Sequence, residues 1–87
     1  MNDPKVVIYP DKAGEFRWRL VGGNGENQAA GEGHSTAEHA EEAASTVGRN
    51  FARIAGFDVS DGFPLKEEYV ERIESVEEAE ARDLEVG

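Results

Sequence analysis

Apolar and polar residues alternate along the first third of the chain, which predicts three β-strands. The clearest strand covers residues 15–21, where apolar and charged side chains alternate with a period of two. A β-branched and aromatic run at residues 5–9 predicts a strand before it, and a weaker strand is expected at residues 26–30. Turn-forming residues separate these strands at 10–14 and 22–25. We therefore expect an antiparallel meander.

The apolar period lengthens to three and four residues after the third strand, which predicts one long helix. Ser35 and Glu38 fit a capping box that starts the helix, and Gly56 is placed to end it in a left-handed cap. The apolar stripe between them consists of Ala40, Ala43, Ala44, Val47, Phe51 and Ile54. Its small N-terminal residues allow a close approach to the sheet, and its bulky C-terminal residues are expected to supply most of the burial.

The segment after this helix allows two interpretations. Residues 57–60 fit a short strand, and residues 61–64 fit a turn followed by a helix start. Apolar residues between 65 and 76 then recur at helical spacing, which favours a second helix. Alternatively, residues 68–73 form a strand and Ser75 caps a short final helix. Periodicity alone favours the helix over 65–76, and both interpretations stay open.

The charge of the chain is concentrated near its C-terminus. The 87 residues include 9 Lys+Arg against 19 Asp+Glu, for a net charge of -10, and residues 57–87 carry eleven acidic and three basic side chains. Because this length allows one small domain, we expect a domain over residues 1–60 and an acidic extension over residues 61–87. The acid-rich, lysine-poor composition is typical of a halophilic cytoplasm, where strong surface charge keeps a protein hydrated in salt. A basic partner for the extension is the alternative.

Composition also excludes several classes of protein. The chain has no cysteine, which removes disulfide frameworks and thiolate metal sites. Its longest strongly apolar run, residues 6–9, is too short to span a bilayer. We therefore expect a cytoplasmic protein without a membrane partner, and the net charge disfavours binding to nucleic-acid phosphates.

The first half of the chain resembles the YegP-like family of small uncharacterised proteins. The resemblance is carried by residues 9–20 (YPDKAGEFRWRL), 24–26 (NGE) and 32–35 (EGHS), before a helix that ends in Arg49-Asn50. It covers roughly residues 8–50 without gaps. The resemblance implies a β-β-β-α-β unit that occurs as a tandem pair or as a homodimer, with one continuous sheet and exchanged last strands. Because this chain holds one such unit, the resemblance implies a homodimer.

The chain also departs from the family pattern. His34 stands where the family usually has an aromatic residue, and Asn27-Gln28 stands where it has two apolar β-formers. The chain is longer and more acidic beyond Asn50, so the exchanged last strand is expected at Phe57–Ser60 or Glu68–Ile73. The family carries no established activity, so the resemblance implies architecture and not chemistry.

One cluster of side chains could bind a small ligand or a cation. It comprises His34, Glu38, His39 and Glu42. The two histidines are five residues apart, which does not place them on one helical face. We therefore expect surface side chains here and predict no catalytic residue, cofactor or metal site.

A second candidate surface lies on the predicted hairpin of strands. It comprises Lys12, Arg17, Arg19 and Asn24, interleaved with two aromatic residues. Basic and aromatic side chains on one sheet face can hold single-stranded nucleic acid. The alternation, however, places the rings and the arginines on opposite faces. We therefore expect the rings in the core and the arginines in a solvated or dimer-facing row.

These patterns assign no biochemical activity and lead to three hypotheses. The favoured one is a non-catalytic, homodimeric interaction or structural module of a halophilic cytoplasm, with no enzyme activity and no identified further protein partner. The first alternative is a nucleic-acid binder using Lys12, Arg17 and Arg19. The second is a small-ligand or cation binder around His34 and His39.

Overall fold

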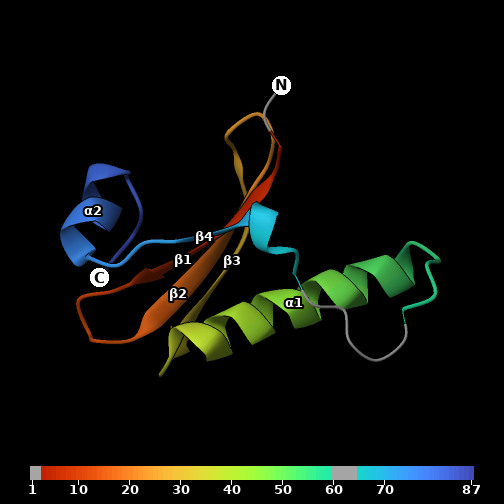
Figure 1. Ribbon diagram of the computed structural model, residues 1–87, viewed down its shortest axis with the longest axis horizontal. Helices are drawn as coiled ribbons and strands as arrows, with labels where there is room; N and C mark the ends of the chain where they lie inside the picture. Colours follow the sequence, from red (N-terminus) through yellow and green to blue (C-terminus); the bar gives the residue numbers. More distant parts are fainter. Residues whose placement is uncertain (1–2, 60–64) are drawn as a thin grey trace.

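The computed structural model describes residues 3–59 and 65–87 and has an α+β architecture (Figure 1). In chain order the elements are β1 (Lys5–Pro10), β2 (Phe16–Val21), β3 (Asn27–His34), α1 (Ala37–Ile54), the 3₁₀ turn η1 (Glu67–Tyr69), β4 (Val70–Arg72) and α2 (Val76–Ala81). The strands form one sheet in the order β3-β2-β1-β4. The long helix α1 packs on one face of this sheet, and the C-terminal segment with α2 packs on the other.

The three strands of the meander are confirmed. β1 and β2 pair antiparallel with Ile8 opposite Trp18, and β2 and β3 pair antiparallel with Trp18 opposite Gly31. The indole of Trp18 lies so close to Gly31 that a Cβ atom there would collide with it. β3 is longer than the predicted segment 26–30, because pairing with β2 continues as far as His34.

The fourth strand corrects the expectation of a wholly antiparallel sheet. β4 pairs parallel to β1, with Val6 opposite Val70 and Ile8 opposite Arg72, so the sheet is mixed. The direction follows from the connection: β1 and β3 run the same way because each is antiparallel to β2. A helix after β3 returns the chain to the end where β3 began, so the next strand enters in that same direction.

The strand interpretation of the C-terminal segment is confirmed, and the helix over residues 65–76 is wrong. β4 covers Val70–Arg72, and the Ser75 hydroxyl accepts a hydrogen bond of 3.1 Å from the Glu78 amide at the start of α2. The helical spacing was misleading because these apolar residues pack on opposite faces of the sheet. Leu65 packs against the core on the α1 face, and Ile73 belongs to the core on the other face. Residues 57–59 form no strand, while Ser60 and the turn expected at 61–64 lie outside the described residues.

The start of α1 differs from the prediction by one residue. The N-cap is Thr36, whose hydroxyl accepts a hydrogen bond of 3.0 Å from the His39 amide. The predicted capping box of Ser35 and Glu38 is therefore wrong; Ser35 Oγ lies 3.4 Å from His39 Nδ1 instead. Both candidate caps are hydroxyl residues, so local chemistry alone did not separate them.

The end of α1 is confirmed. Gly56 has φ +92°, and its amide donates to the Arg53 carbonyl while the Phe57 amide donates to the Ala52 carbonyl. These two bonds are the Schellman pattern that ends a helix at a left-handed glycine.

The prediction for the apolar stripe of α1 is half right. Ala40 and Ala44 are buried against the sheet, but Phe51 is 63% exposed and Ile54 is 82% exposed. An 18-residue helix is about 27 Å long, and its C-terminal half extends past the sheet (Figure 1). The bulky end therefore does not supply the burial expected of it.

β1 is buried on both faces, so the sheet separates two small cores. The core on the α1 face contains Val6, Ile8, Trp18, Ala40 and Ala44. The core on the opposite face contains Val7, Tyr9, Ile73, Ala79, Leu84 and Val86. Four of these six residues come from the acidic C-terminal segment, which therefore packs against the same sheet.

Candidate functional site

The structure brings together two of the four residues of the hairpin surface. Arg17 and Arg19 lie on the sheet face opposite α1, where both line one hollow. Lys12 lies in the β1–β2 turn, with its ammonium 3.8 Å from a Glu80 carboxylate oxygen. Asn24 lies in the β2–β3 turn, where its side-chain oxygen accepts from the Glu26 amide at 3.0 Å. The arginines alone therefore share a site.

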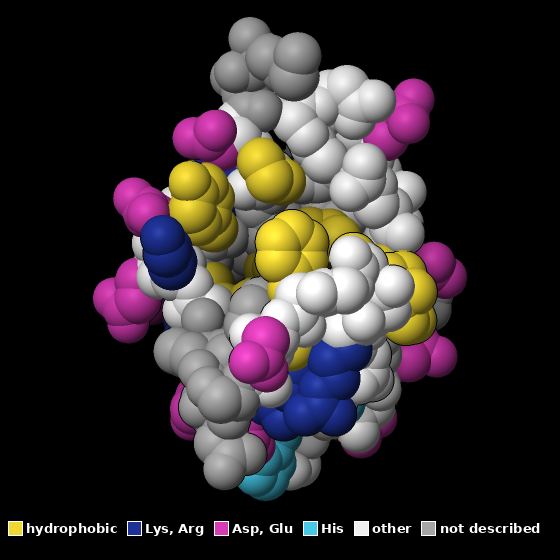
Figure 2. All heavy atoms as spheres, turned by 90° about the vertical axis from the view of Figure 1, so that its right-hand side faces the viewer, with side chains coloured by type: hydrophobic (Ala, Val, Ile, Leu, Met, Phe, Trp, Pro, Cys, Tyr) yellow, Lys and Arg dark blue, Asp and Glu magenta, His cyan; other side chains and the backbone are white. Residues whose placement is uncertain are grey.

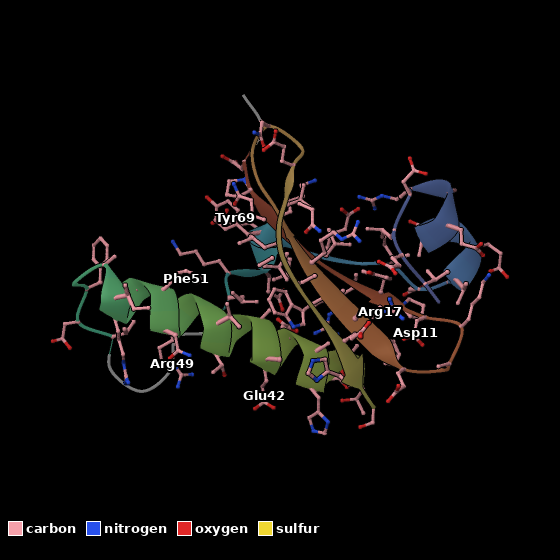
Figure 3. All side chains as sticks on the ribbon, turned by 180° about the vertical axis from the view of Figure 1, so that it is seen from behind. Asp11, Arg17, Glu42, Arg49, Phe51 and Tyr69 are labelled. Atoms are coloured by element: carbon pink, nitrogen blue, oxygen red, sulfur yellow. The ribbon has the colours of Figure 1, made fainter. Side chains whose placement is uncertain are left out.

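Arg17 is fixed by a buried carboxylate that the sequence analysis did not single out. The Arg17 Nε atom donates to Asp11 Oδ2 at 3.0 Å, and Asp11 Oδ1 accepts from the amides of Ala13 and Glu15 at 2.9 Å each (Figure 3). Arg17 Nη1 also donates to the Glu85 carbonyl at 3.0 Å. An aspartate at the start of a turn was the available signal, because such side chains accept from amides two residues on.

This network shifts the pKa values of both partners. Burial alone would raise the pKa of Asp11, but hydrogen bonds from the Glu15 amide, Arg17 and the Ala13 amide together hold it below its ordinary value. The hydrogen bond to Asp11 raises the pKa of Arg17 above its ordinary value. Both groups therefore stay charged over the whole neutral range.

The hollow beside Arg17 has a volume of about 220 Å³. Its walls are formed by Tyr9, Arg17, Arg19, Ala30, Gly31, Glu32 and Glu85. The carboxylate of Glu32 approaches Arg17 Nη1 at 3.3 Å, although 70% of the Glu32 side chain is exposed. The Nε atom of Arg19 is buried and has no hydrogen-bond partner within the described part of the chain.

The histidine and glutamate cluster does not converge on one point. His39 contacts Ser35, and Glu38 Oε2 lies 3.8 Å from Arg72 Nη1. Glu42 points away from the sheet (Figure 3). His34 is at the end of β3, before the helix begins. Over residues 3–59 and 65–87, no group of three or more His, Asp or Glu side chains is placed to hold a metal ion.

An apolar surface is exposed at the C-terminal end of α1, where the apolar stripe predicts burial of Phe51 and Ile54. This apolar end comprises Phe51, Ile54 and Phe57, which are 63%, 82% and 70% exposed. Tyr69 of η1 is 37% exposed. An apolar hollow of about 260 Å³ lies over β1, β2 and η1 and is lined by Pro4, Lys5, Val6, Leu20, Leu65 and Tyr69. Figure 2 shows hydrophobic side chains gathered on this side of the molecule, next to a group of basic ones.

Comparison with known proteins defines the family. A family profile described as "Domain of unknown function (DUF1508)" matches residues 11–53. The chain is 42% identical over 57 residues to UPF0339 protein Atu0232 of Agrobacterium fabrum, an alignment covering 66% of this chain and 87% of that protein. No solved structure matches significantly.

These features define a small α+β protein with one mixed sheet and one long helix. The chain belongs to the DUF1508 (UPF0339) family, the group of YegP-like proteins, which confirms the resemblance. The description of this family names no activity. Within the described residues, no helix is long and apolar enough to cross a membrane.

Proposed function

We propose that this protein is a non-catalytic, homodimeric interaction module whose apolar end is covered by a second copy of the chain. The observation that carries the proposal is the exposure of Phe51, Ile54 and Phe57 on a helix that extends past its own sheet. Small monomeric domains rarely expose large contiguous apolar surface, and such surface marks interaction sites. Burying one large apolar side chain contributes about 1.5–3 kcal/mol, and a two-fold dimer would bury this set twice.

Charge favours a second copy as the occupant. The chain as a whole carries a net charge of -10, which opposes self-association through most of its surface. Residues 43–57, in contrast, contain Arg49 and Arg53 and no acidic residue. This end of α1 is therefore a surface where two acidic copies can approach without bringing their carboxylates together.

The shape of the chain supports a self-complementary contact. The apolar end of α1 protrudes past the sheet, and the same chain carries an apolar hollow lined by Leu20, Leu65 and Tyr69. In a two-fold dimer, a protrusion and a hollow on one chain meet the hollow and the protrusion on its partner. We therefore place the symmetry axis between the two copies of the α1 C-terminus.

Exchange of the last strand is compatible with this arrangement. β4 pairs with β1 over three residues, and the chain reaches it from the protruding end of α1. A swapped β4 makes the same contacts with β1 of the other copy, so exchange costs few contacts. Salt strengthens such a dimer, since it screens the repulsion between the acidic copies and favours apolar burial. The acid-rich composition supports a salt-rich cytoplasm as its setting.

The experiment is light scattering after size exclusion, in dilute buffer and in molar salt. The variant Phe51→Ala/Ile54→Ala removes the bulk of the apolar end and keeps good helix formers; the matched control is Asn50→Ala on the same turn. We expect a dimer for the wild type and the control in molar salt, and a folded monomer for the double variant. Equal masses for wild type and double variant contradict the proposed interface.

Strand exchange has its own measurement. Isotope-filtered NMR on mixed labelled and unlabelled chains reports whether contacts between Val7 and Ile73 join two chains or one. Contacts between chains support exchange, and contacts within one chain contradict it. The interface at the apolar end of α1 is tested separately by light scattering.

A further inference from the structure

The face of the sheet away from α1 carries a polar hollow of a different kind. It lies where α2 and the C-terminal segment cover β1 and leave the arginines of β2 at the surface of a cavity of about 220 Å³. Tyr9, which is 2% exposed, forms one wall, and the chain at Ala30 and Gly31 of β3 forms another. The walls are thus formed by a central strand and its paired neighbours.

Arg17 is oriented before any ligand arrives. Its Nε and Nη1 atoms are held by Asp11 Oδ2 and the Glu85 carbonyl, each at 3.0 Å, and 3% of the Asp11 side chain is exposed. A guanidinium fixed on a buried carboxylate loses little conformational entropy when it binds a further acceptor. This is the arrangement expected of a binding residue with a supporting partner.

Arg19 adds a second cation on the same face. It stands two residues beyond Arg17 on β2, so the two side chains project to one side about 7 Å apart along the strand. Its buried Nε atom has no acceptor among the described residues. Arg19 is therefore the less satisfied of the two arginines, and its guanidinium adds positive charge to the hollow that it lines.

Glu32 lies at the edge of the hollow, near the arginine atoms that an anion would bind. Its carboxylate lies 3.3 Å from Arg17 Nη1, but the side chain is 70% exposed, and exposed ion pairs contribute little. Glu32 therefore behaves as a weak internal competitor that a better-placed oxyanion can displace. Glu85 also lines the hollow, and together the two glutamates disfavour a long polyanion such as a nucleic-acid strand.

We propose that the hollow between Arg17 and Arg19 binds a small oxyanion, the carboxylate or phosphate group of a low-molecular-weight metabolite. Both guanidiniums donate to the oxyanion, Glu32 swings away, and the volume limits the ligand to one such group with a short attached chain. Arginine is suited to this role because its planar fork matches the oxygens of carboxylates and phosphates. The dimer contact at the apolar end of α1 uses none of the residues that line this hollow, and an exchanged β4 would bring Glu85 to it from the second copy.

The test is NMR titration of the full-length protein with potassium phosphate and, separately, potassium succinate, against potassium chloride at matched ionic strength. We expect saturable shifts at the amides of Ala30 and Gly31 and at the side-chain Nε–H groups of both arginines. The expected dissociation constant is on the order of 1 mM, as for a ligand of few atoms. Saturation by both probes supports a general oxyanion site, and saturation by one assigns the site to phosphate or to carboxylate.

Three variants sharpen the result. Arg19→Gln should weaken binding at least about tenfold, because it removes charge-assisted hydrogen bonds. Glu32→Gln should strengthen binding by about threefold, because it removes an exposed competing charge; this exposed change keeps the test valid even if Arg19→Gln fails to fold. The control Lys66→Gln removes an exposed cation outside both proposed surfaces and should leave binding unchanged. Shifts that do not saturate, that chloride reproduces, or that Lys66→Gln and Arg19→Gln reduce equally overturn the proposal.

Discussion

The two faces of the sheet share the central strand β1 but are completed in different ways. On one face, Ile8 and Trp18 pack against the alanines of a long helix, and the bulky end of that helix remains exposed. On the other face, Val7 and Tyr9 are covered by short C-terminal elements, and the adjoining Arg17 is held by polar contacts. An excess of apolar surface suits a protein partner, whereas a fixed polar hollow suits a small ligand. The comparison shows how the two faces of one small sheet can offer different binding surfaces, one apolar and one polar.

The largest expected effect comes from removing residues 61–87. This change deletes β4 and α2 and strips Val7 and Tyr9 of their cover, including Ile73, Ala79, Leu84 and Val86. We expect the fragment 1–60 to lose cooperative unfolding in urea, followed by circular dichroism, in dilute buffer and in molar salt. A fragment that unfolds cooperatively would instead support an independent domain over 1–60 with an accessory acidic extension.

Trp18→Ala tests the opposite face. Trp18 is 5% exposed and lies at the centre of the α1 core, so its truncation should lower the free energy of unfolding by about 3–5 kcal/mol. The control is Phe57→Ala, which removes a ring that is 70% exposed and should change monomer stability by less than about 0.5 kcal/mol. Urea denaturation in dilute buffer measures both. Equal losses of unfolding free energy would mean that Phe57 is buried in the monomer, which would contradict an exposed C-terminal end of α1.

Asp11→Asn tests the polar network of the second face. The change leaves the Arg17 guanidinium without its buried countercharge and should cost about 2–4 kcal/mol. The pKa of Asp11 is lowered in the folded state, so its contribution is fully present above the ordinary aspartate pKa of about 4. That contribution is lost as pH falls through the lowered, folded-state pKa. Denaturation from pH 7 to pH 2 should show the wild type and the variant converging at the acid end; a constant difference would contradict the linkage.

Arg82→Gln has the smallest expected effect. Arg82 joins the end of α2 to β4 through Glu71, with Nη1–Oε2 at 2.7 Å and Nη2–Oε1 at 2.9 Å, and this bond lowers the pKa of Glu71. Because both side chains are partly exposed, the loss should be about 0.5–1 kcal/mol in dilute buffer. Molar salt screens the pair beyond about 3 Å, so the difference in unfolding free energy should shrink there. A salt-independent difference would indicate a packing effect.

Much of the secondary structure was predictable because its signals are local. The alternation around Trp18 defined β2, and the left-handed glycine after α1 defined the helix end. Local signals also produced the errors. Ser35 and Thr36 are both competent caps, and helical spacing over residues 65–76 arose from residues that face opposite sides of the sheet.

The candidate sites were less predictable than the elements that carry them. The sequence placed Arg17 and Arg19 on one face, opposite the rings, because alternation along a strand is a property of the backbone. It did not place Asp11 beneath Arg17, nor the Glu85 carbonyl beside it, since that contact joins residues 68 positions apart. It also assigned Phe51 to the core, because an apolar stripe shows which side of a helix is apolar and not how much of it finds a partner.

The sequence by itself therefore determined the three strands of the meander, the two turns between them, the end of the long helix and the family, because alternation, turn residues and capping act over a few positions. The tertiary structure alone decided that β4 runs parallel to β1, that α1 buries its alanines and exposes its bulky end, and that two arginines line a common hollow. Each of these features depends on contacts between residues that are far apart in the sequence, and local sequence patterns do not specify such contacts.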